Sequence, residues 1–474
     1  MSVTDYEPVI GLEVHCQLAT RTKMFSACPQ AIGEPPNTRI DPYTLALPGT
    51  LPVLNATAVR HGVALALALG STVQRTSRFA RKHYFYPDLP KGYQITQADE
   101  PYAVGGAVEI ASGTVRLHHI HFEEDAGKNV HVAGEDVSLV DYNRAGAPLL
   151  EIVGEPDLRS ARDAAEFLRA LRGVVRALGI SEANMEEGTL RCDANVSLRR
   201  RGTEPMGTRC EIKNLNSFRF LERAIEAEIR RQADLLDAGE PVVMATMSFD
   251  PDRGITKIMR LKEEAADYRY LPEPDLPLLV VSEALEAEIA AAQPELPAAR
   301  HVRYRALGLS EADATLLVGE PELAGFFDAT CEAGAAPKAA ANWLSGEVLA
   351  RLDGAPVSTG PIAPAQLAEL VGLVEDGTIS GRAGKAVLST MWSEGGSARA
   401  IADRDGHRQV SDSSVLEAAV AEVVAASPRQ VEQYRGGKTA LKGYFVGQVM
   451  KKTRGQANPK LVSEIVDRVL AETS

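Results

Sequence analysis

Residues 8–18, PVIGLEVHCQL, put apolar side chains at every second position from Ile10 to Leu18 and polar ones at 13, 15 and 17. This pattern is typical of a β-strand that buries one face. Glu13 and His15 fall on the polar face, and strand geometry puts side chains two residues apart about 7 Å from each other. Since a carboxylate and an imidazole at that separation can converge on one ion, the strand is the first candidate for a functional site.

Two further acidic segments could complete such a site: the run 121–128, HFEEDAGK, and Glu151 inside the apolar stretch 148–153. A carboxylate in the middle of an apolar strand costs several kcal/mol to desolvate unless a cation compensates it. Oxygen ligands with one imidazole suit Mg²⁺ or Mn²⁺. The alternative is that Glu151 pairs with a buried arginine and that His15 is a hydrogen-bonded strand residue.

The segment 81–95 interleaves three cations with tyrosine and phenylalanine between prolines. Such a surface can stack bases and contact phosphates, but it could equally be a loop packed by its own aromatics. Segments 186–197 and 211–218, dense in Asn, Asp, Lys and Arg, fit phosphate binding or ordinary turns. The substrate-binding candidates are Arg81, Lys82, Lys91 and Tyr93.

A basic segment near the C-terminus opposes the sign of the whole chain, since residues 435–460 contain no Asp or Glu. Local cations dominate binding to RNA phosphates, so this segment is a candidate RNA contact; the alternative is a solvated helix face. Its cations are Arg435, Lys438, Lys442, Lys451, Lys452, Arg454 and Lys460.

Composition indicates an ordinary globular protein of several domains: 474 residues, 45% hydrophobic, with a formal net charge of -13. That charge argues against non-specific coating of nucleic acid. The five scattered cysteines form no C-x-x-C pair, which disfavours a disulfide framework. Without a membrane span or a signal peptide in the pattern, a cytoplasmic location with no membrane partner is expected.

The order of patterns predicts an α+β fold, in which a catalytic domain on an antiparallel sheet precedes an all-helical domain and a small helical tail. We place these domains at residues 1–295, 296–410 and 411–474. Two amphipathic helices are expected in the first domain, one capped by Ser160 and ending at Gly179, the other beginning near Ser217.

Several catalytic motifs are excluded. Gly437-Lys438-Thr439 resembles the end of a phosphate-binding P-loop, but Glu432 stands where its first glycine should be. The chain has no G-x-S-x-G motif. Cys192 has no paired base in the sequence, so a packed thiol is the expected state.

Six ordered motifs together resemble the B subunit of bacterial aspartyl/glutamyl-tRNA amidotransferase, and the resemblance runs essentially from end to end. A matching tail signature occupies residues 447–459. The six motifs are VIGLEVH (9–15), LPGTLPVLN (47–55), YFYPDLPKGYQ (84–94), EEDAGK (123–128), DYNRAG (141–146) and DYRYLPEPDLP (267–277).

The resemblance implies a cradle-shaped catalytic domain and a reaction. The protein would use ATP and Mg²⁺ to phosphorylate the side-chain carboxylate of Glu or Asp misattached to tRNA(Gln) or tRNA(Asn), and ammonia would then displace phosphate. It also implies partners: an amidase (A) subunit that makes ammonia from glutamine, and a small C subunit. A non-discriminating synthetase is a further candidate partner. A non-catalytic scaffold that presents tRNA is the alternative function.

By resemblance, the catalytic and metal-binding residues are Glu13, His15, Glu124 and Glu151, and the tRNA contacts are Lys438, Lys442, Lys451, Lys452 and Arg454. Many relatives carry two cysteine pairs for zinc, where this chain has Ser26 and Cys28, then Asp41 and Thr44. With one ligand left of four, no zinc is expected. The length leaves no room for the extra domain of the archaeal glutamine-specific form, which favours the bacterial two-substrate form.

Overall fold

A computed structural model describes residues 5–30, 33–132, 134–203, 205–261, 268–409, 413–453 and 457–472. The chain divides into two compact units, Met1–Pro297 and Ala298–Ser474. The second unit contains two separate hydrophobic clusters, one between Tyr304 and Ala402 and one between Leu416 and Leu470. The expected division at residue 411 falls between these clusters and stays a prediction.

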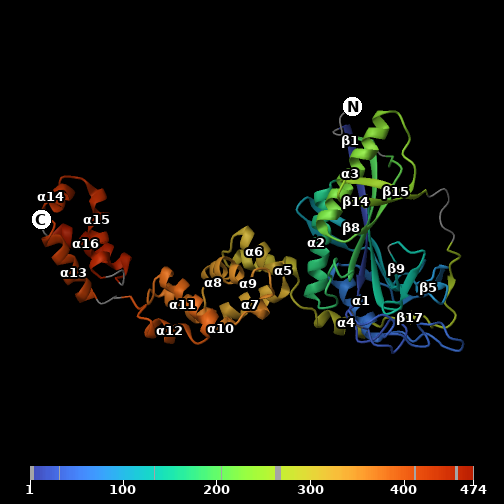
Figure 1. The fold of residues 1–474 in the computed structure, drawn as a ribbon, viewed down its shortest axis with the longest axis horizontal. Helices are drawn as coiled ribbons and strands as arrows, with labels where there is room; N and C mark the ends of the chain where they lie inside the picture. The colour runs from blue at the N-terminus through green and yellow to red at the C-terminus, as the bar shows by residue number, and fades with distance from the viewer. Residues whose placement is uncertain are drawn as a thin grey trace. The chain divides into compact units, whose positions relative to one another are not determined.

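The first unit is built on a ten-stranded sheet, drawn in Figure 1, with the order β15-β14-β13-β12-β1-β11-β8-β6-β2 and with β7 beside β8. The α+β class is confirmed. The strand pairs of the sheet are antiparallel as expected, except that β13 and β14 run parallel. The strands are β1 (Tyr6–Gln17), β2 (Thr72–Val73), β6 (Ala103–Val104), β7 (Ala107–Ile110), β8 (Gly113–Glu124), β11 (Pro148–Gly154), β12 (Leu190–Arg200), β13 (Cys210–Leu215), β14 (Ala245–Asp250) and β15 (Ile255–Leu261).

Two amphipathic helices, α2 (Ala161–Ala177) and α3 (Phe218–Asp237), cover one face of this sheet (Figure 1). Both begin as the sequence predicts: Ser160 accepts a hydrogen bond from the Asp163 amide, and Ser217 accepts one from the Phe220 amide. Leu12, Val14 and Cys16 of β1 are fully buried in the core that the helices complete. The polar side chains of the same strand therefore face away from the helices.

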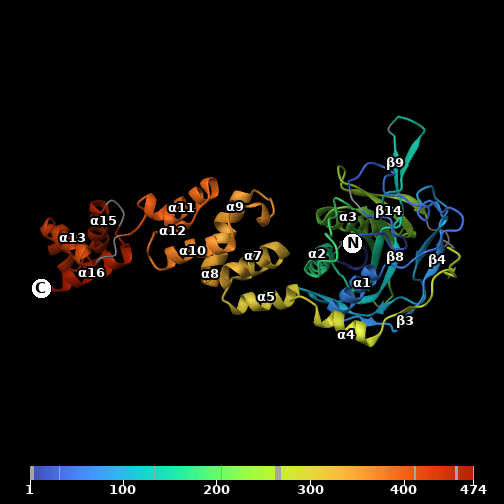
Figure 2. The ribbon, with the colours of Figure 1, turned by 90° about the horizontal axis from the view of Figure 1, so that it is seen from below.

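Smaller strand pairs lie outside the large sheet. β4 (Ala80–His83) pairs with β5 (Tyr93–Thr96) and with β16 (Leu271–Pro272), so the two ends of the aromatic segment 81–95 are joined. The hairpin of β9 (Lys128–His131) and β10 (Ser138–Asp141) projects from the unit in Figure 2. The remaining pair is β3 (Thr76–Ser77) with β17 (Leu279–Val280).

The second unit is helical, as expected. Within the described ranges of the whole chain, no helix has the length and apolar character needed to cross a membrane. The helices after α4 (Glu283–Ala291) are α5 (Pro297–Ala306), α6 (Glu311–Val318), α7 (Pro321–Glu332), α8 (Pro337–Trp343), η2 (Leu344–Val348), α9 (Leu349–Leu352), η3 (Val357–Thr359), α10 (Pro364–Glu375), α11 (Gly381–Glu394), α12 (Ala398–Arg404), α13 (Ser413–Ala425), α14 (Pro428–Arg435), η4 (Thr439–Leu441), α15 (Lys442–Lys452) and α16 (Pro459–Glu472).

Helix α1 (Ala56–Ala68) approaches β8 through a glycine. A Cβ atom at Gly62 would lie 2.4 Å from the Phe122 ring, which is itself stacked on Tyr102 with ring centroids 4.1 Å apart. Tyr102 also donates its hydroxyl to the Gly62 carbonyl at 2.9 Å. The close contact of helix and strand therefore requires a residue without a side chain.

We expect Gly62→Ala to lower the free energy of unfolding by about 1–3 kcal/mol, because an added methyl would displace the stacked rings. The control is Gly173→Ala in α2, where the new Cβ would meet only Pro297 at an ordinary 3.7 Å. That change should stabilise the helix by up to about 1 kcal/mol. Urea unfolding of both variants measures the difference, and equal stability of the two would contradict the packing argument.

Candidate functional site

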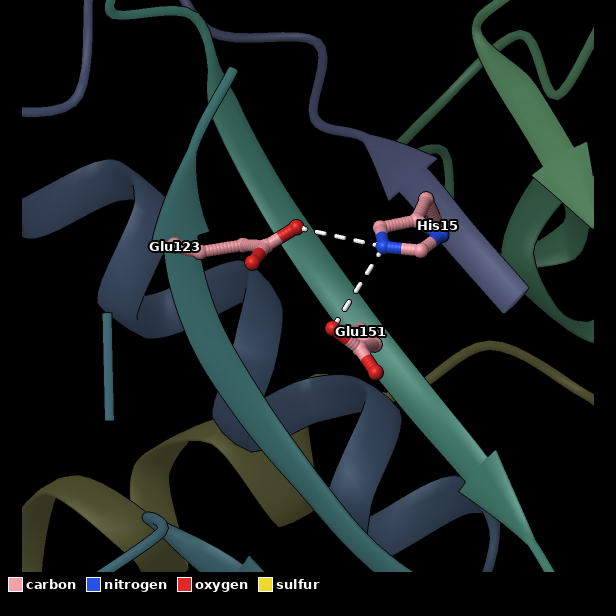
Figure 3. Close-up of side chains that lie close together, drawn as sticks. All are labelled: His15, Glu123 and Glu151. Atoms are coloured by element: carbon pink, nitrogen blue, oxygen red, sulfur yellow. Dashed lines mark ion pairs between the residues drawn. The ribbon is translucent and has the colours of Figure 1, made fainter. Parts of the chain in front are cut away.

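Three side chains from three adjacent strands meet on the face of the sheet opposite the helices (Figure 3): His15 of β1, Glu123 of β8 and Glu151 of β11. The register sets Glu151 directly beside His15, and Leu149 beside both Gln17 and Glu123. One potential ligand atom from each of the three residues lies within 4.8 Å of the other two. We call this group the His15 triad.

The triad is held by ion pairs around one imidazole. His15 Nε2 lies 3.4 Å from Glu123 Oε1 and 3.4 Å from Glu151 Oε2. Behind them, His121 Nε2 lies 3.4 Å from the same Glu151 oxygen. The alternative in which a buried arginine neutralises Glu151 is not what the structure has: among the described residues, its recorded partners are these two histidines.

Burial and neighbouring charges shift the pKa values of the three triad residues in different directions. Burial alone would lower the pKa of His15, but its hydrogen bond to Glu151 and the charges of both carboxylates raise it to about 9. Burial raises the pKa of Glu123. Burial opposes ionisation of Glu151 too, yet hydrogen bonds from His121 and His15 hold its pKa well below the usual range. The group therefore favours a compensating positive charge.

Glu13 lies on the same face, two residues before His15, but outside the triad. Its side chain accepts a hydrogen bond from Asn195 at 2.9 Å. Burial, followed by the charges of Glu151 and Glu211, raises the pKa of Glu13. Glu13 is thus a neighbour of the three residues rather than one of the ligand atoms that they bring together.

The structure corrects the expectation for Glu124. Side chains alternate along β8, so Glu123 reaches the cleft while Glu124 points to the core side, where it is 1% exposed. There it forms an ion pair with Lys91 and accepts a hydrogen bond from the Ile95 amide at 3.0 Å. Glu123, which the sequence pattern did not single out, takes its place beside His15 and Glu151.

The triad borders a cleft of about 1080 Å³ that is lined by polar and charged side chains, among them His15 and Glu123. Of the four substrate-binding candidates, Lys82 lines this cleft. Glu123 and Glu151 raise the pKa of Lys82 against the opposing effect of burial. Among the described residues, no carboxylate oxygen is recorded within 4.0 Å of its Nζ. The Lys82 ammonium lies 4.8 Å from the centre of the Tyr268 ring, so among the described residues it is the candidate that lines the cleft without a carboxylate partner.

The other three candidates are engaged elsewhere. Arg81 forms a bidentate pair with Glu273 at 2.7 and 2.8 Å, and its guanidinium lies 4.3 Å from the centre of the Tyr93 ring. Lys91 donates to Tyr43 at 3.0 Å in addition to its pair with Glu124. These contacts support the structural interpretation for part of the segment 81–95, although Phe85 is 79% exposed.

The polar segments 186–197 and 211–218 both reach the cleft. Arg191 lies opposite His15 in the register of β12 and β1. Lys213 of β13 bridges Asp193 and Glu211, with 2.8 Å to each. Cys192 is 1% exposed and burial raises the pKa of its thiol well above the usual value, so it is a packed side chain.

Cys28 and the segment that holds Asp41 and Thr44 lie beside a buried lysine, Lys23. Asp41 accepts hydrogen bonds from the amide and hydroxyl of Thr44, each at 2.7 Å. Lys23 donates to Thr44 and, at 2.7 Å, to the Arg39 carbonyl. Cys28 is 6% exposed. Hydrogen bonds among these side chains therefore join the two segments, and the absence of zinc stays a prediction.

The basic segment near the C-terminus forms η4, α15 and the start of α16. Lys438 and Lys451 are exposed. Lys442 lies 2.5 Å from Asp467, and Lys452 forms an ion pair with Glu422. Arg454 lies outside the described residues.

The comparisons with known proteins now define a class. The family model described as the GatB/GatE catalytic domain matches residues 8–287, and the one described as the GatB domain matches residues 325–470. The first match contains the whole of the triad, so the α+β unit is a catalytic domain of this class.

Curated relatives narrow the class to one family. The B subunit of aspartyl/glutamyl-tRNA(Asn/Gln) amidotransferase from Anaeromyxobacter sp. (strain K) is 52% identical over 100% of both chains, and that from Synechococcus sp. (strain JA-3-3Ab) is 50% identical over 98% of both. A third protein of the same name, from Nitratidesulfovibrio vulgaris (strain DP4), is 50% identical over 98% of this chain and 99% of its own. The chain belongs to the family of aspartyl/glutamyl-tRNA(Asn/Gln) amidotransferase B subunits.

We expect Glu123→Gln and Glu151→Gln to weaken Mn²⁺ binding by at least about 10-fold, because each removes a charged oxygen from the triad. Glu124→Gln should leave Mn²⁺ affinity unchanged. It should instead lower the free energy of unfolding by roughly 1–3 kcal/mol, since Lys91 would lose its buried ionic partner. Electron paramagnetic resonance of free Mn²⁺ and urea unfolding provide the two readouts.

Glu109→Gln on β7 is the control, since Glu109 is exposed and bonds only to Thr114 among the described residues. If Mn²⁺ affinity fell in Glu124→Gln and not in Glu123→Gln, the result would support Glu124 as the metal ligand in place of Glu123.

Proposed function

We propose that this chain is the tRNA-handling and amidating component of a tRNA-dependent amidotransferase, and that its cleft performs an ATP-dependent step. Family membership supports the coarser part, since the relatives are named as parts of an enzyme acting on tRNA(Asn/Gln). The observation that carries the finer part is the His15 triad at the edge of a large polar cleft.

The reaction begins with an unfavourable approach of two anions. A side-chain carboxylate of Glu or Asp on the tRNA attacks the γ-phosphorus of ATP, forming an acyl phosphate and ADP; ammonia then attacks the acyl carbon, and phosphate leaves as the amide forms. Both phosphate and carboxylate must be held in line, with their repulsion offset. A site for this chemistry needs fixed cations beside an opening wide enough for an aminoacyl end.

The donor set of the triad fits Mg²⁺. Two carboxylates and one imidazole offer hard oxygen ligands and a nitrogen within 4.8 Å of one another, in a partly buried position that favours added positive charge. His15, Glu123 and Glu151 would hold the ion. When bound, Mg²⁺ neutralises charge on phosphate oxygens and orients them.

The chain's own side chains have separate tasks in this proposal. His121 orients Glu151 through its Nε2, which is 3.4 Å from the carboxylate oxygen. Lys82 attracts the reacting carboxylate or phosphate, since it lines the cleft next to the triad. Ammonia would come from the amidase partner, and a small C subunit would complete the complex; both follow from the family.

The proposal predicts tRNA-dependent ATP turnover by the complex of this chain with its amidase partner. Phosphate release should require Glu-tRNA(Gln) or Asp-tRNA(Asn), and the more effective tRNA names the physiological substrate. Glu151→Gln should lower kcat by about 100-fold or more while tRNA still binds, because charge compensation worth several kcal/mol is lost. Glu109→Gln should retain full activity.

A complex that binds tRNA but does not turn over ATP would overturn the kinase step and favour the tRNA-presenting scaffold. In that case Glu151→Gln would bind and present tRNA as the parent chain does.

For the basic segment, we expect Lys438→Ala and Lys451→Ala each to weaken tRNA binding and to reduce the slope of log K against log salt by about 1, the value for one lost phosphate contact. Lys338→Ala on the exposed surface of α8 is the control. Fluorescence anisotropy across a salt series measures the slope, and unchanged slopes for both variants would remove this segment from the RNA interface.

A further inference from the structure

A cluster of two arginines and one aspartate lies in the cleft near the His15 triad. Asp125, two residues beyond Glu123, is 3% exposed. Arg191 donates to Asp125 Oδ2 at 2.8 Å, and Arg144 Nε lies 3.4 Å from the same oxygen. All three residues line the cleft, as His15 does.

The cluster keeps a net positive charge. Two guanidiniums share one carboxylate, so one charge remains uncompensated within the group. Each guanidinium side chain is 35% exposed although the carboxylate between them is buried.

Hydrogen-bond donors remain available on both arginines. Arg191 uses Nη2 for Asp125, and Arg144 uses Nε and Nη2 for the carbonyls of Ala126 and Gly127, at 3.0 and 2.8 Å. Among the described residues, no acceptor is recorded for Arg191 Nη1 and Nε or for Arg144 Nη1. These N–H groups can therefore reach a ligand in the cleft.

The backbone that carries the cluster is rigidly positioned. Asp125 donates its amide to the Ala147 carbonyl and accepts from the Gly146 amide, both at 2.8 Å. A Cβ at Gly127 would lie 2.9 Å from the Asp141 carbonyl oxygen, so the turn passes too close for any side chain. Because the backbone of the cluster is already held in place, binding a ligand there costs little conformational entropy.

We propose that Arg144 and Arg191 form a polyphosphate subsite that holds the phosphate chain of the nucleoside triphosphate. The inference rests on the proposed function for the nature of the nucleotide. Guanidinium N–H groups match the geometry of phosphate oxygens. Arg191 stands directly opposite His15 in the register, so a phosphate chain on this cluster extends toward the triad.

The test uses the chain in complex with its amidase partner and inorganic tripolyphosphate as the probe, in metal-free buffer, by isothermal titration calorimetry. Arg144→Gln and Arg191→Gln should bind the probe about 10- to 100-fold more weakly, the expected loss for a hydrogen bond to a charged group. Arg191→Lys keeps the positive charge but lacks the planar guanidinium. Its affinity for the probe should therefore lie between that of the two glutamine variants and that of the parent chain. Arg162→Gln on the exposed face of α2 is the control.

The outcomes separate this inference from the proposed function. Unchanged tripolyphosphate affinity in correctly folded Arg144→Gln and Arg191→Lys overturns the subsite, even if ATP turnover confirms the function. Arginine-dependent binding of the probe supports the subsite, even if no tRNA stimulates ATP turnover. A loss of tRNA affinity with unchanged probe affinity would assign the arginines to an RNA phosphate and overturn the proposal. Circular dichroism confirms folding of each variant.

Discussion

A buried and a half-buried carboxylate side by side are the constraint around which the first unit is organised. Glu123 and Glu151 lie on neighbouring strands and repel each other, and water cannot screen them well. His15 compensates part of this charge from the same face, and His121 Nε2 lies 3.4 Å from Glu151. The opposite face of the same strands is mostly apolar, with Glu124 paired to Lys91 as an exception, and its burial in the core fixes the strands in register.

The charge distribution in the cleft follows from this arrangement. Carboxylates gather around His15, whereas the cluster of Asp125 with its two arginines carries a net positive charge. An ion at the triad and a polyphosphate on the arginines would each cancel the charge that the protein leaves uncompensated. In the two proposals above, the subsites would favour a metal–nucleotide pair over either component alone, because the two bound charges attract each other.

Local signals in the sequence predict the helices and strands but only part of the candidate site. The caps at Ser160 and Ser217 depend on residues three positions apart, and both form as predicted. His15 and Glu151 were found because alternation in one strand and an isolated carboxylate in another are each visible alone. The family resemblance indicates Glu124, whereas period-two alternation puts Glu123 on the same face as His121, because the core residue Phe122 lies between His121 and Glu123.

The arginine cluster had no such signal. Arg144, Arg191 and Asp125 come from three distant segments, and only the order of β1, β12, β11 and β8 brings them together. The spacing of these three residues along the sequence does not indicate that they meet. The sequence therefore marks the polar segments but does not predict which of their side chains pair.

The lysines show why charge in a sequence is a poor guide to charge available for binding. Lys91 and Lys442 each pair with one carboxylate, Glu124 and Asp467. The side chain of Lys91 is 7% exposed and its partner 1%, so removing either leaves a buried charge, and no phosphate can replace Glu124. Lys442 and Asp467 are 34% and 50% exposed, and a surface pair of this kind contributes little. An RNA phosphate can exchange with Asp467 at small cost, so the paired lysines of the C-terminal segment remain available to RNA while Lys91 does not.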